Sequence, residues 1–207
     1  MAGPTLDFWQ QRFEAGDLPW DRGEPGPQLA VWQQAGLLAP GVRVAVPGCG
    51  SGHEVLALAQ AGCHVTAIDY APGALALTRQ RLEAAGLPAS AVTLVQADVL
   101  AWQPDEPVDV IYEQTCWCAL HPDHWSAYAA RLAHWLRPGG TLALLAMQAL
   151  REGAREGRVE GPPYHLDVHM LRALLPASGW DWPAPPHVPV PHPNGRWFEL
   201  AITLQRR

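Results

Sequence analysis

From residue 42 onward, short apolar runs alternate with helix-like segments, and this alternation restricts the chain to few folds. The apolar runs expected as strands lie at 42–47, 64–69, 92–98, 108–113 and 141–147. The helices expected between them lie at 53–61, 71–85 and 122–136. Strands that alternate with helices predict a mostly parallel sheet with helices on both faces. A chain of 207 residues suits one domain with a sizeable core, so we expect a single α/β domain.

Two later regions break this alternation. Residues 151–163 are polar and glycine-rich, which predicts a mobile loop. Residues 181–195 hold six prolines in fifteen positions, and proline cannot complete the hydrogen-bond ladder of a central strand. The apolar run that follows, within 196–207, predicts a final strand paired antiparallel at the sheet edge.

The segment "VPGCGSGHE" (46–54) places Gly48, Gly50 and Gly52 straight after the first expected strand. Glycine loses more conformational freedom on folding than any other residue, so something must offset three of them here. Two explanations fit: a turn too tight for side chains, or a ligand that touches the backbone.

The type of ligand follows from the residues beside the glycines. A dinucleotide fingerprint would require a third glycine where this chain has His53, and Glu54 would repel a diphosphate from the helix N-terminus. A cofactor without phosphates is therefore favoured, and S-adenosylmethionine (SAM) fits. Its ribose needs a carboxylate at the end of the second strand, where Asp69 lies, and its adenine an acceptor after the third, where Asp98 lies. Carboxyl ends of parallel strands meet at one crevice.

Composition excludes several other classes of function. The net charge is −6, and all 14 basic residues are scattered arginines, which is unlike a phosphate-binding surface, so no nucleic-acid partner is expected. No apolar stretch has the length of a membrane span. The start "MAGPTLDFWQ" shows no signal-peptide pattern. We expect a cytoplasmic monomer that acts on a small molecule.

A metal site is not expected either. Cys116 and Cys118 are separated by one residue rather than the two of zinc and redox motifs. Because the sequence shows no export signal, the four cysteines are expected as free thiols. His165 and His169 have the spacing of ligands on a helix, but Asp167 is typical of a helix N-cap, which places His165 outside that helix.

Aromatic side chains suit a cationic sulfonium, because ring faces attract cations. Trp20 lies in a loop-like stretch, "AGDLPWDRGEPGP", where packing alone explains it less well than ligand contact does. Four other tryptophans have helical spacing and are expected to serve packing alone: Trp9, Trp32, Trp125 and Trp135.

Four stretches together resemble one known family. They are "FWQQRFEAGDLPWDRGEPGPQL" (8–29), "VPGCGSGHEVLALA", "AIDYAPGALALT" and "GPPY" (161–164), and they resemble the thiopurine S-methyltransferase family, in particular its halide and thiol methyltransferase branch. The resemblance covers most of residues 6–148. It implies the Rossmann-like class I methyltransferase fold with a mostly parallel seven-stranded sheet, an N-terminal lid (1–30) on a core (42–207), and methyl transfer from SAM to a thiol, a thiopurine sulfur or a halide.

The resemblance also assigns roles by position. It places the methionine part of SAM at the glycine loop, the ribose at Asp69 and the adenine at Asp98 and Val99, with Trp20 closing over the cofactor. Tyr164 is expected to face the methyl acceptor, and Glu113 to lie beside the cofactor at the reacting end. The full set expected to bind SAM is Trp20, Gly48, Cys49, Gly50, Asp69, Tyr70, Asp98, Val99 and Glu113.

Alternatives remain for the chemistry. Glu113-Gln114 and Trp117 depart from the plant relatives' pattern near the acceptor, so the acceptor is the least determined element. A thiolate or halide already carries the attacking charge and needs no base, whereas methylation of oxygen or nitrogen would need one, such as Glu113 or a histidine. A SAM-binding sensor without turnover is a third reading. A nicotinamide-dependent oxidoreductase is disfavoured by His53 and Glu54.

Overall fold

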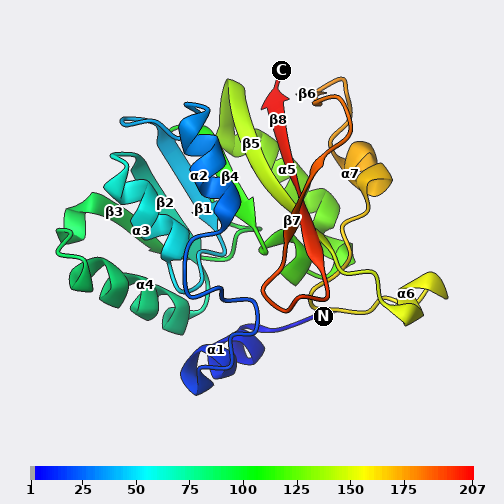
Figure 1. Cartoon of the computed structure of the whole chain (residues 1–207), viewed down its shortest axis with the longest axis horizontal. Helices are drawn as coiled ribbons and strands as arrows, with labels where there is room; N and C mark the ends of the chain where they lie inside the picture. The colour runs from blue at the N-terminus through cyan, green and yellow to red at the C-terminus, as the bar shows by residue number, and fades with distance from the viewer. Residues whose placement is uncertain (1–2) are drawn as a thin grey trace.

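The computed structural model describes residues 3–207, apart from the side chains of Ala89, Ala154 and Arg155 (Figure 1). Within these residues eight strands form one sheet in the order β3-β2-β1-β4-β5-β8-β6, with β7 paired to β8. The strands are β1 (Arg43–Pro47), β2 (His64–Asp69), β3 (Val92–Gln96), β4 (Val108–Gln114), β5 (Leu136–Gln148), β6 (Trp180–Asp181), β7 (Val188–Pro191) and β8 (Phe198–Arg206). Strands β1 to β5 are parallel and β6 to β8 pair antiparallel. The expected Rossmann-like α/β fold is confirmed.

Helices cover both faces of this sheet, as the alternation predicts. They are α1 (Leu6–Ala15), α2 (Pro27–Gln34), α3 (His53–Gln60), α4 (Pro72–Ala84), α5 (Trp125–Trp135), α6 (Glu152–Arg155) and α7 (Val168–Leu174). Successive residues of β1 enter different cores: Val44 and Val46 pack with α2, α3 and α4, whereas Ala45 packs with α5 and α7. This is the two-residue period of a strand buried on both faces.

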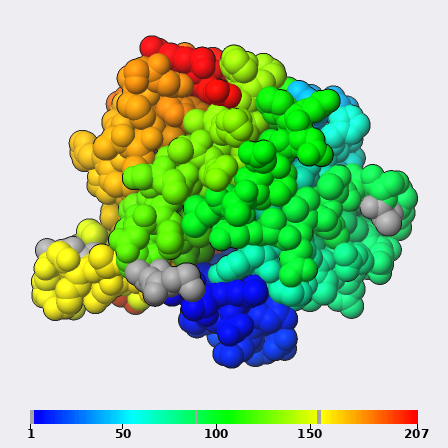
Figure 2. Space-filling view, turned by 180° about the vertical axis from the view of Figure 1, so that it is seen from behind, coloured from blue at the N-terminus to red at the C-terminus, as the bar shows by residue number. Residues whose placement is uncertain are grey.

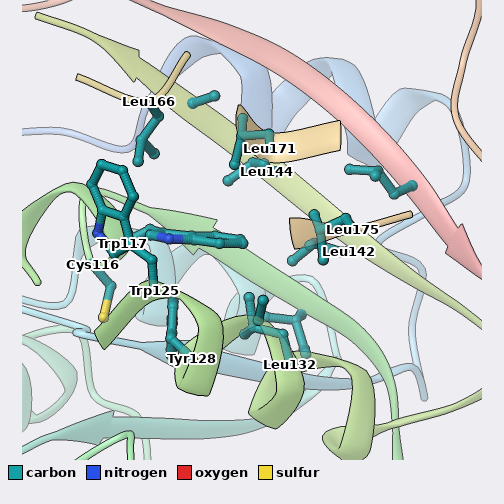
Figure 3. Close-up of a cluster of buried hydrophobic side chains, with 14 of the residues drawn as sticks. Cys116, Trp117, Trp125, Tyr128, Leu132, Leu142, Leu144, Leu166, Leu171 and Leu175 are labelled. Atoms are coloured by element: carbon teal, nitrogen blue, oxygen red, sulfur yellow. The ribbon is translucent and has the colours of Figure 1, made fainter. Parts of the chain in front are cut away.

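The core on the α5 side is built largely from aromatic and leucine side chains (Figure 3). Trp125 and Trp135 of α5 are buried there, and Trp32 of α2 is buried in the opposite core. These three tryptophans have the packing role that their spacing predicts. Short 3-10 helices at Trp117–Ala119 and Pro122–His124 connect β4 to α5.

The C-terminal edge differs from the expectation of seven strands. Strands β6 and β7 pair with opposite ends of β8, at Gln205–Arg206 and at 198–201. The residues between them contain Pro183, Pro185 and Pro186, which lack the N–H donors that would continue the ladder. One edge strand is therefore interrupted, and the count becomes eight. The final strand β8 forms the predicted antiparallel pair at this edge of the sheet, where it lies between β5 and the interrupted strand.

Two other segments lie outside the sheet. The stretch expected as a mobile loop contains the four-residue helix α6, and its mobility stays a prediction. Helix α1 packs on α4, where the Gly73 N–H donates to Gln10 Oε1 at 2.9 Å. Figure 2 shows α1, in blue, as a lobe below the body of the domain.

Candidate functional site

The carboxyl ends of β1 to β4 open into one cavity of about 730 Å³. Binding sites for small molecules usually occupy roughly 300–1,000 Å³, so this one has room for a nucleoside cofactor together with a small second ligand. Its walls come from the strand-end loops, the N-terminal residues 3–20, the segment 161–163 and the turn of the β7–β8 hairpin. The cavity lies where open α/β sheets bind ligands.

The three glycines after β1 serve two different purposes. All three have positive φ, at 58° for Gly48, 55° for Gly50 and 77° for Gly52. A Cβ on Gly48 would lie 2.8 Å from the Cβ of Cys116, and one on Gly52 would lie 2.6 Å from Thr78 Oγ1. At Gly50 the nearest atom would be a carbonyl oxygen at 4.0 Å, so the space in front of it is open. Tight packing therefore explains Gly48 and Gly52, whereas Gly50 is favoured by its positive φ and leaves its backbone open to a ligand.

Asp69 ends β2 as a buried carboxylate in the cavity wall. Its Oδ2 accepts from the Gly50 N–H at 3.1 Å and its Oδ1 from the Ala71 N–H at 2.9 Å. Burial raises the pKa of this carboxyl to about 6, against the lowering effect of those bonds. Each oxygen keeps a lone pair for a further donor. Asp69 is thus held where it can accept from two hydroxyls of a ribose.

The residues after β3 extend the same wall. Asp98 is exposed, with Oδ1 accepting from the Leu100 N–H at 2.8 Å, and Val99 is buried beside it. Both line the cavity, as does Tyr70. An acceptor oxygen next to an apolar surface suits an adenine, which has an amine edge and flat faces.

A smaller side pocket of about 60 Å³ adjoins the cavity at the glycine loop. It shares Trp20 and Gly50 with the cavity, and its charged side chains are the carboxylates of Asp21, Glu24 and Glu54 and the guanidinium of Arg22. Cys49 lies against this pocket rather than the main cavity. The carboxylates suit the ammonium group of SAM's amino-acid end, whereas the Arg22 guanidinium is engaged by Pro191 and Glu199. The residues at the strand ends and in this pocket therefore fit the ribose, the adenine and the ammonium group of this cofactor.

Trp20 forms part of an aromatic wall above the strand ends. Its ring lies edge-on to those of Trp9, at 5.3 Å between centroids, and Phe13, at 6.0 Å. All three line the cavity. The expectation that Trp9 serves packing alone is therefore wrong. Helical spacing predicts that Trp9 lies on the apolar face of its helix, but it does not predict that this face of α1 also borders the cavity.

Glu113 is not among the described residues that line the cavity. Its side chain is 0% exposed, Oε1 accepts from the Trp117 N–H at 2.6 Å, and Oε2 is without a partner. Burial raises its pKa to about 8, and the charge of Glu199 adds to this. Glu113 therefore lies beneath the loop after β4 as a protonated acid at neutral pH, rather than at the cofactor as its sequence position implies.

Tyr164 is also set back from the cavity. Its ring packs edge-on against His121 and Trp125, at 5.5 and 6.5 Å between centroids, and its N–H donates to the Cys118 carbonyl at 2.7 Å. The neighbouring Pro162 and Pro163 line the cavity, whereas Tyr164 does not. The segment reaches the site as expected, but the phenol backs the wall instead of forming it.

Sequence reasoning missed the histidines of this wall. His121, His124 and His192 line the cavity, together with Asn194 and Trp197 from the turn between β7 and β8. Nδ1 of His192 accepts from the Asn194 N–H at 3.4 Å, and burial lowers the pKa of this imidazole. It is thus neutral, with Nε2 protonated as a donor. The signal in the sequence is the repeated His-Pro-Asp/Asn, at 121–123 and 192–194.

The histidine pair considered for metal binding gives no site. Asp167 caps α7 by accepting from the His169 and Met170 N–H groups, so His165 lies outside that helix, as predicted. Within residues 3–207 no three His, Cys, Asp or Glu side chains are grouped to hold a metal ion. All four cysteines are free.

The profile of the thiopurine S-methyltransferase family matches residues 4–182. Among curated proteins, the probable thiol methyltransferase 2 of Arabidopsis thaliana is 33% identical over 182 residues, covering 87% of this chain and 76% of that protein. The thiocyanate methyltransferase 1 of the same plant is 31% identical, over 83% and 72%. The thiopurine S-methyltransferase of Legionella pneumophila strain Paris is 28% identical, over 95% and 92%.

Solved structures show the same fold at lower identity. The 1,6-didemethyltoxoflavin-N1-methyltransferase of Burkholderia thailandensis, solved with S-adenosylhomocysteine, superposes with a TM-score of 0.73 at 20% identity, over 100% of this chain and 93% of that one.

None of the helices in the described part of the chain combines the length and apolarity needed to cross a bilayer.

Proposed function

Because this chain belongs to the thiopurine S-methyltransferase family, we propose that it transfers a methyl group from SAM to a soft nucleophile, a thiol or thiopurine sulfur or a halide, and releases S-adenosylhomocysteine. The family match makes the protein a methyltransferase enzyme, so the reading as a sensor without turnover is not favoured. One observation carries the proposal: the cavity joins a buried carboxylate at Asp69 to a wall of aromatic and neutral side chains.

The chain's own residues account for cofactor binding. Asp69 would hold the ribose hydroxyls, Asp98 and Val99 the adenine, and the Gly50 backbone with the side pocket the amino-acid end. When bound, SAM supplies an electrophilic methyl group on a cationic sulfur. The rings of Trp20 and Trp9 suit that cation, because aromatic faces stabilise positive charge by about 0.5–2 kcal/mol each.

The acceptor side of the cavity favours an anionic sulfur or halide. The described residues that line it there include Met147, Trp197 and the neutral His192, and no carboxylate among them would repel an anion. In-line displacement requires the acceptor to be held in line with the methyl group and water to be excluded. Burial raises the pKa of the Cys116 and Cys118 thiols, so these two wall residues stay protonated and do not compete as nucleophiles.

A turnover screen tests this function directly. Release of S-adenosylhomocysteine is measured with thiols, thiopurines, iodide, thiocyanate and selenium or tellurium species. The matched control is a phenol with the same skeleton, such as phenol beside benzenethiol, because phenol stays un-ionised at neutral pH. We expect the thiol to react about a hundredfold faster or more, the size of effect that a missing general base produces. Turnover of the phenol or of amines alone would overturn the assignment.

The N-terminal segment 1–30, of which residues 1–2 lie outside the described part of the chain, is proposed as a lid over the core 42–207. Residues 3–20 cover the cavity with the α1 face and Trp20, and closing a cavity over its ligands excludes water from the reaction. Hydrogen exchange of this segment should slow when S-adenosylhomocysteine is added, and equal exchange in both states would refute the lid. One chain supplies the walls described above, in keeping with a monomer, and the cytoplasmic location stays a prediction.

A further inference from the structure

Three consecutive residues after α1 contact three different parts of the site. Trp20 lines the cavity. Asp21 accepts from Ser51 Oγ at 2.5 Å and lies 2.9 Å from His53 Nε2, both at the glycine loop. Arg22 donates through Nη2 to the Pro191 carbonyl at 2.7 Å and to Glu199 Oε2 at 3.0 Å. The segment that carries the cofactor wall is thus bonded to the C-terminal hairpin.

Arg22 contacts both strands of the β7–β8 hairpin, beside the turn. Pro191 ends β7 immediately before His192, and Glu199 lies in β8 two residues after Trp197. The turn between them holds the hairpin residues that line the acceptor side of the cavity, His192, Asn194 and Trp197. In Figure 1 this turn lies at the same end of the molecule as α1. A single guanidinium therefore joins the Trp20 segment to the hairpin that bears the acceptor wall.

Glu199 connects the same network to β4. Its carboxylate is 0% exposed and also accepts from Gln114 Nε2, at 3.1 and 3.4 Å. Gln114 in turn accepts from the Tyr112 hydroxyl at 3.0 Å. A buried ion pair is a weak source of stability, because desolvation offsets its attraction, but removal of one partner is costly. Such a pair holds two segments in one relative position.

Resting on the proposed function, we propose that Arg22 and Glu199 are positioning residues that couple the two halves of the site. When SAM or its product orders Trp20, Arg22 holds the β7–β8 hairpin in the position where His192 and Trp197 meet the acceptor. Coupling of this kind is reciprocal, so a bound acceptor tightens cofactor binding by the same factor.

Hydrogen exchange with S-adenosylhomocysteine alone tests the coupling without turnover. In the natural chain the product should slow exchange in residues 17–26 and also in 188–198. Because Arg22 also lines the side pocket, the measurement on Arg22→Met uses a product concentration that saturates the variant. The first segment should then remain protected and the second should exchange as it does without ligand. The control is Arg207→Met, which removes an exposed pair with Asp181 at the other end of β8 and should leave both responses intact.

Kinetics supply the second readout. At a SAM concentration that saturates the variant, Arg22→Met should raise the KM for an acceptor identified in the turnover screen by about fivefold or more, the usual range of coupling between sites, with kcat within about twofold. Arg22→Lys keeps the charge but loses the two-way contact, so it should restore part of the effect. If Arg22→Met does not fold, the same exchange and kinetic measurements are made on Glu199→Gln, which keeps the shape of the side chain but removes its charge.

The outcomes separate this proposal from the proposed function. Product binding with unchanged protection of 188–198 in both Arg22→Met and Glu199→Gln would overturn the coupling and leave the methyltransferase assignment intact. Failure of the natural chain to bind S-adenosylhomocysteine would overturn the function itself.

Discussion

The cofactor side and the acceptor side of the cavity are built in different ways. The proposed cofactor side comes mainly from consecutive parallel strands, each contributing residues at or just after its own carboxyl end, such as Gly50, Asp69 and Asp98. The acceptor side is assembled from segments far apart in the chain: the loop after β4, Met147, the prolines at 162–163 and the β7–β8 hairpin. Local sequence determines the first, whereas long-range packing determines the second.

Because of this difference, a substitution on one side of the cavity need not disturb the other side. A substitution in the hairpin would alter the proposed acceptor wall without moving the strand ends proposed to hold the cofactor, because β1 to β5 form their own parallel ladder. Acceptor preference can thus vary on a constant cofactor site. The ion pair between Arg22 and Glu199 joins the segment that carries Trp20 to the hairpin of the acceptor side.

The largest expected effect is at Asp69. Asp69→Ala removes the carboxylate that would accept from the ribose, and a hydrogen bond to a charged group contributes about 1.5–3 kcal/mol. We expect S-adenosylhomocysteine to bind about ten- to a hundredfold more weakly, as measured by calorimetry.

Two controls make that result specific. Circular dichroism must show that Asp69→Ala is folded, because the carboxylate also caps the Gly50 and Ala71 N–H groups. Asp181→Ala, at an exposed carboxylate remote from the cavity, should bind normally. Unchanged product affinity in folded Asp69→Ala would remove this residue from the cofactor site.

The sequence predicts the cofactor side well because each signal is local. The strands β1 to β4, the positive-φ glycines and Asp69 are recognisable from neighbouring residues alone. The acceptor side gives no such signal: that Glu113 lies beneath its loop, and that Tyr164 stands behind His121, depends on how distant segments pack. Trp9 was missed for the same reason, since helical spacing does not say which surface its face meets.

A pair of tryptophans gives a more sensitive comparison of the two sides. Trp20→Ala should weaken product binding about tenfold, through loss of the apolar ring surface that would pack against the bound product. Trp197→Ala should raise the KM of the acceptor about tenfold while product affinity, measured without acceptor, changes less than about threefold. Calorimetry and steady-state kinetics on both variants decide it. Equal effects of both variants on product affinity would show that the two walls are not separable.

Tyr164 tests how far the acceptor side extends behind its surface. A phenol in contact with the acceptor would cost about tenfold in turnover when replaced by Phe, the effect of one hydrogen bond. In the structure the ring instead supports His121, and Phe preserves that contact. We therefore expect Tyr164→Phe to retain turnover within about threefold, with product affinity unchanged. A loss of tenfold or more on every accepted substrate would place the hydroxyl at the acceptor after all.

The smallest effect on activity is expected at Glu113, which also separates sulfur transfer from the alternative that needs a base. Glu113→Gln should keep turnover within about twofold, whereas loss of an essential general base costs about a hundredfold or more.

The stability of the fold, rather than turnover, should respond to Glu113→Gln. Burial raises the pKa of Glu113 from its ordinary value of 4.5 to about 8, so between these pH values the folded chain keeps a proton that the unfolded chain has released. The free energy of unfolding therefore falls as pH rises through this window. Glu113→Gln removes that titration, so denaturant unfolding measured from pH 5 to 8 should show a flatter dependence than in the natural chain. Parallel pH profiles of stability, or a steep loss of turnover in the variant, would show that this carboxyl reaches the cavity or is ionised in the fold.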